Sequence, residues 1–150
     1  MDVENTNSEL GRAVFRCDDN TNIYGRTPNS ELGRAAFRGD IRGVENALNN
    51  GAGDVNHGMT RAAEGGHLHI FNIFIKLGAT RLDAAMIAAA RGQSYHIIDR
   101  IAGLGYKDVR FAMWNAHISK DKQMFDYLGY ICSDFVDLES MMNTLSIGVQ

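Results

Sequence analysis

The chain has 150 residues, of which 45% are apolar and 22% are charged, and its formal net charge is −3. This composition is typical of a folded domain and argues against disorder throughout the chain. The arginines are scattered among acidic residues, which argues against nucleic-acid binding as a primary role, because neutralising phosphates requires clustered Lys and Arg.

The N-terminal residues carry neither the basic region nor the apolar core of a cleaved signal peptide. No apolar run approaches the roughly 18 residues of a membrane span. The two cysteines, Cys17 and Cys132, lie far apart and show no metal-binding spacing, which favours a reducing compartment. We therefore expect an intracellular protein with no membrane partner.

Residues 1–28 are interpreted as an N-terminal extension. Within it, NSELGRAVFRCD at 7–18 nearly duplicates NSELGRAAFRGD at 29–40. A polar stretch then ends at Pro28, which excludes a second helix before the next segment. The duplicate is either a loosely packed cap, or a spare first helix that competes for the place of residues 31–38 within one chain or in a swapped homodimer.

From residue 31 the chain repeats itself without a gap, in copies of equal length at 31–57, 58–84, 85–111 and 112–138. An apolar column, an alanine column and a glycine column all keep this spacing: Leu32, Met59, Met86 and Met113; Ala35, Ala62, Ala89 and Ala116; Gly51, Gly78 and Gly105. One spacing shared by columns of different chemistry indicates stacked copies of one supersecondary unit.

Each copy is predicted to be a helical hairpin with a short first helix, a turn, a second helix and a loop. In the copy 58–84, Gly65 and Gly66 end the first helix. A column of capping residues is expected to begin the second helices: Asp40, Ser94 and Asp121, with His67 in the second copy. The column of Gly51 should close the second helices in the left-handed conformation, whereas Cys132 in the fourth copy predicts a helix that ends differently or runs on.

Residues 139–150 are interpreted as a partial fifth first helix, which serves as a C-terminal cap of a repeat domain spanning 29–150. A cap is needed because the last hairpin of a stack otherwise leaves one face uncovered.

The strings AAEGGHLHIFNIFIKLGAT and AAARGQSYHIIDRIAGLGY resemble the ankyrin repeat, and the shortened copies found in giant DNA viruses in particular. The ordinary ankyrin unit has about 33 residues, and the TPLH motif is missing here. The resemblance implies an all-α, ankyrin-like helical-hairpin solenoid with short loops in place of the β-hairpin fingers. It also implies a viral protein that binds protein partners in the host cytoplasm.

No catalytic, cofactor or metal site is predicted. His67 and His69 point apart on a helix, His96 lies one repeat beyond His69, and no carboxylate or cysteine completes a ligand set. The GxSxG, GxxxxGK[ST], HExxH and GxGxxG motifs are absent. Cys17 is not expected to act as a nucleophile, since it lies in the extension.

A partner surface is predicted where columns differ between copies, because the constant columns are needed for packing. Three such columns lie on the first helices: Gly33, Thr60, Ile87 and Trp114; Arg34, Arg61, Ala88 and Asn115; Phe37, Glu64, Arg91 and Ile118. Trp114, beside Ile87 and Ile118, is the expected apolar anchor, flanked by Arg61 and Arg91. Alternatively, Trp114 packs under the C-terminal cap.

Charged loop residues, including Arg81 and Arg110, are predicted to form either a polar rim of this surface, together with Arg34, or merely a solvated edge. The expected function is a non-catalytic protein–protein interaction module. The alternative is a self-assembling structural protein that forms a homodimer through its N-terminal segment or its end repeats.

Overall fold

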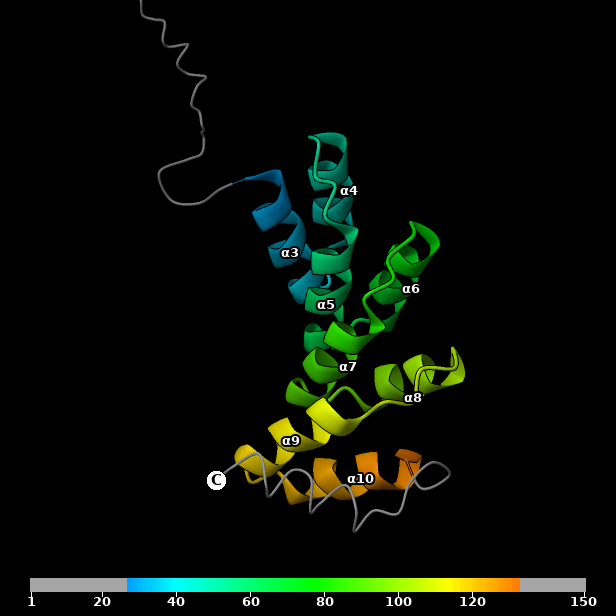
Figure 1. The fold of residues 1–150 in the computed structure, drawn as a ribbon. Helices are drawn as coiled ribbons and strands as arrows, with labels where there is room; N and C mark the ends of the chain where they lie inside the picture. The colour runs from blue at the N-terminus through cyan, green and yellow to red at the C-terminus, as the bar shows by residue number, and fades with distance from the viewer. Residues whose placement is uncertain (1–26, 133–150) are drawn as a thin grey trace, which may run out of the picture.

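The computed structural model describes residues 27–132, which form eight α-helices and no strand (Figure 1). The first helices of the four hairpins are α3 (Pro28–Arg38), α5 (Val55–Gly65), α7 (Leu82–Arg91) and α9 (Arg110–Ile118). The second helices are α4 (Ile41–Asn49), α6 (Leu68–Lys76), α8 (Tyr95–Gly103) and α10 (Lys122–Cys132). The predicted all-α class is confirmed. Within the described range, no helix combines the length and apolarity that crossing a membrane requires.

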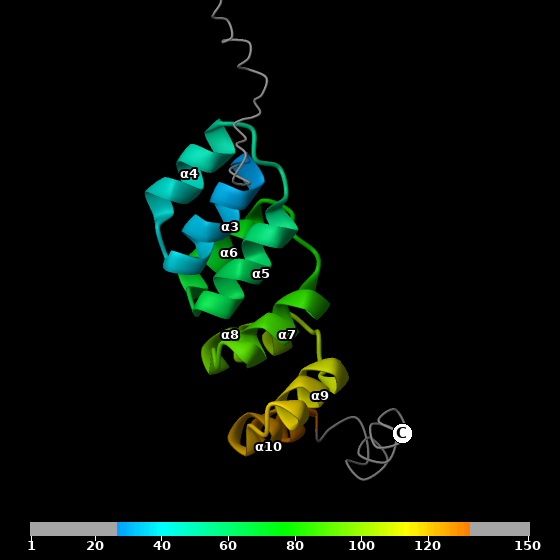
Figure 2. The same cartoon turned by 90° about the vertical axis from the view of Figure 1, so that its left-hand side faces the viewer.

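The four hairpins follow one another in a stack (Figures 1 and 2). Each first helix packs on the next, α3 on α5, α5 on α7 and α7 on α9, whereas the second helices meet one another much less. As a result the second helices fan outwards, and the first helices line the concave side of the stack (Figure 1).

Small and flexible side chains let the first helices approach one another closely. The alanine column from Ala35 to Ala116 is at most 6% exposed, and the column from Leu32 to Met113 is at most 1% exposed. Glycine permits still closer approach at two junctions, because a Cβ atom added to Gly65 or Gly92 would overlap the carbonyl of Phe37 or Glu64 in the preceding first helix.

Two of the three predicted caps are confirmed. Asp40 Oδ1 accepts a hydrogen bond from Gly43 N at 2.9 Å, and Asp121 Oδ1 accepts one from Met124 N at 3.0 Å. Ser94 is the N-cap residue of α8 as predicted, but its hydroxyl does not make the expected capping hydrogen bond. Ser94 is only 3% exposed, and it lies where the preceding repeat comes so close that a Cβ atom on Gly66 would be 3.1 Å from its oxygen.

The second helices end as the glycine column predicts. Gly51, Gly78 and Gly105 have φ of +99°, +99° and +96°, the left-handed conformation that glycine adopts without steric cost. Cys132, in the same column, is still helical at the end of α10, as expected for a residue with a side chain.

The stack begins earlier than predicted. Pro28 belongs to the stack and not to the extension, because it is the first residue of α3, where its missing N–H has no helical acceptor to lose. Thr27 before Pro28 and Ser30 after it form a reciprocal capping box. The duplicate at 7–18, residues 133–138 of the fourth copy and the cap at 139–150 lie outside the described residues.

Candidate functional site

An apolar stripe runs along one side of α9. Phe111, Trp114 and Ile118 are spaced three and four residues apart, which places them on one side of the helix. Phe111 and Ile118 are 66% and 61% exposed, and Trp114 is half-buried between them. These three residues are called the α9 stripe below.

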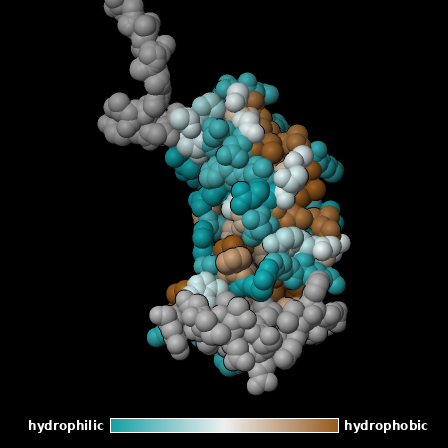
Figure 3. All heavy atoms as spheres, in the orientation of Figure 1, coloured by the Kyte–Doolittle hydropathy of each residue, from teal (hydrophilic) through white to brown (hydrophobic). Residues whose placement is uncertain are grey.

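The concave edge is mainly polar. In Figure 3 hydrophilic residues follow the edge formed by the first helices, and hydrophobic colour returns there at the level of α9. Phe37 on α3 adds a further exposed ring, at 41%. Ile87 on α7, a predicted site residue, is half-buried.

Arg61 and Arg91, the predicted flanking residues of Trp114, both bind Glu64. Glu64 Oε1 accepts a hydrogen bond from Arg91 Nη2 at 2.5 Å, and its other oxygen accepts one from Arg61. The Arg61 guanidinium also lies 4.5 Å from the ring centroid of Phe37. This network joins three successive first helices, α3, α5 and α7.

Two predicted surface columns are only partly exposed. Ala88, in the column of Arg61, is 1% exposed, and Gly33, in the column of Trp114, is buried. Arg34 is half-buried and is bound to Glu31 of its own helix at 2.6 Å. The exposed residues of the first helices therefore do not form continuous columns, and the most exposed apolar ones lie on α9.

The loop arginines each pair with a carboxylate two residues away. Arg81 Nε lies 3.0 Å from Asp83, and Arg110 Nη2 lies 2.5 Å from Asp108. Arg81 and Asp108 occupy the same column, so successive loops carry the same ion pair with its charges exchanged. Hydrogen bonds from the arginines lower the pKa of Asp83 and of Asp108. Each of these two ion pairs is electrically neutral in itself.

Two asparagines that the sequence analysis did not single out hold the loops in place. Asn29 Oδ1 accepts hydrogen bonds from Gly53 N and Asp54 N at 2.9 and 3.1 Å. Asn56, one repeat later, accepts them from Thr80 N and Arg81 N at 2.8 and 2.9 Å. The recurrence of asparagine in one column of the repeat was the available signal.

Comparison with known proteins adds no information on the family or function of the chain. No family model, curated protein or solved structure matches this chain.

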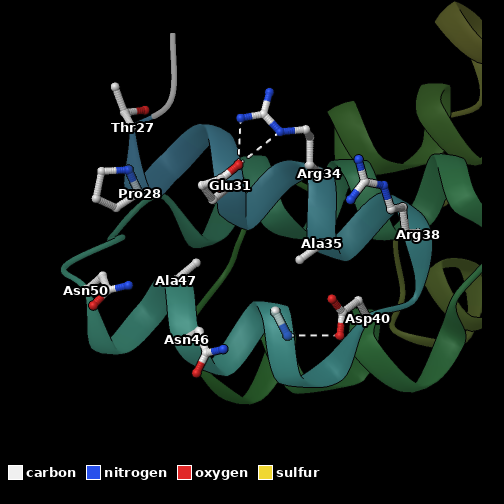
Figure 4. Close-up of a pocket in the computed structure, with 11 residues that line it drawn as sticks. Thr27, Pro28, Glu31, Arg34, Ala35, Arg38, Asp40, Asn46, Ala47 and Asn50 are labelled. Atoms are coloured by element: carbon white, nitrogen blue, oxygen red, sulfur yellow. Dashed lines mark hydrogen bonds and ion pairs between the residues drawn. The ribbon is translucent and has the colours of Figure 1, made fainter. Parts of the chain in front are cut away.

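A hollow of about 360 Å³ lies at the other end of the stack, between α3 and α4 (Figure 4). It is open because α4 carries small or polar residues where α6 carries bulky apolar ones: Gly43, Asn46, Ala47 and Asn50 in place of Ile70, Ile73, Phe74 and Leu77. Arg34 and Arg38 line its rim, and Arg34 is bound to Glu31 there. This end has the polar outer surface that suits the terminal hairpin of a stack.

Two of the described histidines join neighbouring repeats. His67 Nε2 lies 3.1 Å from the carbonyl oxygen of Phe37, and His96 Nε2 lies 3.0 Å from that of Gly66. Between residues 27 and 132 no group of three potential metal-ligating side chains comes together. Cys132 is buried, and burial raises the pKa of its thiol. Cys17 lies outside the described residues.

Proposed function

We propose that this chain is a non-catalytic protein-interaction module, an ankyrin-like solenoid whose concave face binds a protein partner. The observation that carries the proposal is the α9 stripe, in which Phe111 and Ile118 are 66% and 61% exposed on one helix face. Exposed apolar side chains grouped in this way and bordered by polar residues are typical of interaction sites.

The free energy available from burying the exposed residues of the α9 stripe is large enough for protein binding. Burying one large apolar side chain contributes about 1.5–3 kcal/mol, so Phe111 and Ile118 together could account for a substantial part of a micromolar affinity. The Glu64 network supports the same surface, because it fixes the relative positions of three first helices before any partner binds.

The likeness to shortened viral ankyrin repeats supports a more specific form of the proposal. In that form the chain is a viral protein, and its partner is a host or viral protein in the cytoplasm of the infected cell.

The test is a quantitative pull-down from cell lysate with the wild-type chain and with the double variant Phe111→Ser/Ile118→Ser. We expect the partners bound by the wild type to be lost from the variant. The matched control is Leu77→Ser/Leu104→Ser, which removes two apolar side chains that are 49% and 39% exposed at the ends of second helices. Equal recovery by all three chains would rule out the α9 stripe as the binding surface.

A further inference from the structure

The face of the fourth hairpin that points away from the stack is uncovered by any described residue. Each earlier first helix places an alanine in the column of His117, and Ala36, Ala63 and Ala90 are 0%, 0% and 4% exposed, whereas His117 is exposed. The second helices repeat the contrast, since Phe125 is half-buried in a column whose other members are at most 1% exposed: Val44, Phe71 and Ile98.

A missing neighbour on the following side explains both contrasts. The first hairpin has no described neighbour before it, yet Ala36 and Val44 are fully buried. Burial in these two columns therefore comes from the next hairpin, and the fourth hairpin has none among residues 27–132.

Three rings form a cluster on this uncovered face. The rings of Trp114 and His117 stack with centroids 6.2 Å apart and planes 29° apart, and the ring of Phe125 lies 6.2 Å from that of His117. We call these residues the end cluster. It differs in character from the hollow between α3 and α4, where small and polar residues terminate the stack.

We propose that residues 137–145 of the same chain occupy the next first-helix position and cover the end cluster. The described first helices begin at residues 28, 55, 82 and 110, so the next position in the series begins near 137. The chain continues to residue 150, which leaves enough residues for a helix as long as α9.

The register of this contact follows from the first junction. A Cβ atom on Gly33 would meet the side chains of His57 and Arg61, which belong to the next first helix. Trp114 is in the column of Gly33, and the columns of His57 and Arg61, continued past the fourth copy, lead to Leu138 and Met142.

The residues on both sides of this contact differ between the first junction and the last. Where the first junction sets glycine against a histidine and an arginine, the last would set an indole against Leu138 and Met142, which are both apolar. Burying these side chains against Trp114 is favourable in the way that an apolar core contact is.

The chain's own segment is favoured over a second copy because it is tethered. Residue 137 follows the end of α10 by a connection about as short as those between the earlier repeats, and a short tether gives an effective concentration in the millimolar range or above. The proposal also gives the residues of the α9 stripe two different roles. Trp114 is assigned to the chain's own C-terminal segment, and Phe111 and Ile118 remain available for the partner described under the proposed function.

The test uses Trp114, the only tryptophan of the chain, as its own probe. Acrylamide quenching and the emission maximum are measured for the full chain, for Leu138→Asp/Met142→Asp, and for the control Ile147→Asp/Val149→Asp. The control makes the same change of charge at two apolar residues beyond 145. We expect the first variant to increase the quenching constant by about twofold and to shift the emission to the red, because the indole loses its cover. The control should match the wild type.

Circular dichroism and light scattering complete the test: neither variant alters a described residue, so the helical signal of residues 27–132, which is most of the total, should be retained. Equal quenching in all three chains would overturn the proposal. So would a wild-type dimer that dissociates in the first variant, because the occupant would then be a second copy. Either result leaves the pull-down with Phe111→Ser/Ile118→Ser unaffected, so the two proposals fail separately.

Discussion

Among the described glycines, Gly92 at the end of α7 leaves the least room for a Cβ atom, and it provides the sharpest test of the packing. A Cβ atom at this position would lie 2.8 Å from the carbonyl carbon and 3.1 Å from the Cα atom of Glu64, and nearer still to its oxygen. The backbone of Gly92 has φ of −84°, which any residue adopts, so the cost of alanine is steric and not conformational. The obstacle is backbone, which cannot rotate aside.

Gly92→Ala should therefore force α7 away from α5 and destabilise the stack by about 1–3 kcal/mol, the usual cost of overpacking. With an m-value of about 1.5 kcal/mol/M in urea, the unfolding midpoint should fall by roughly 0.7–2 M. Circular dichroism at 222 nm during urea unfolding measures this shift.

The control carries the same chemical change with the opposite expected sign. Gly103 is the last residue of α8, and nothing lies within 4 Å of an added Cβ atom. Gly103→Ala should leave stability unchanged or raise it by up to about 1 kcal/mol, because alanine loses less backbone entropy in a helix. If Gly92→Ala proved as stable as Gly103→Ala, the close contact between α5 and α7 would be refuted.

Three further predictions concern single polar contacts. Burial, together with the hydrogen bond to Asp99, raises the pKa of Tyr127 to about 12. An unfolded tyrosine loses its proton near pH 10, so the free energy of unfolding should fall as pH rises from 10 to 12, and Tyr127→Phe should lessen that slope in urea titrations. Asn56→Ala removes the acceptor of two loop N–H groups and should cost about 1 kcal/mol, measured by the same unfolding, while leaving the helical signal intact. Glu64→Gln should cost up to about 1 kcal/mol and weaken the dependence of stability on NaCl; an unchanged salt dependence would show that its two ion pairs contribute nothing.

The regular parts of this fold are predictable from local residue chemistry. The constant period of the repeat indicated helical hairpins, and the left-handed Gly51, Gly78 and Gly105 were recognisable because that conformation strongly favours glycine. Asp40 and Asp121 were recognisable as caps for a similar reason, since their bonding partners lie three residues away.

The candidate surface was less predictable because its contacts run between repeats. The buried Ser94 hydroxyl makes no capping bond and lies beside Gly66 of the preceding repeat, a contact that its own neighbours in sequence do not reveal. The pairing of Glu64 with Arg91 was recoverable, because opposite charges in one column lie on adjacent first helices. The stacking of Arg61 on Phe37 is diagonal to the columns, so it depends on the relative shift of two helices.

The uneven contacts within the stack have a mechanical consequence. Neighbouring hairpins contact one another extensively through their first helices and little through their second helices. Bending that changes the separation of the second helices breaks few contacts, whereas separating the first helices would break the closest contacts of the stack. A small rotation at each of the three junctions adds up over the length of the stack. The curvature of the concave face can thus change while the spacing between successive first helices stays fixed.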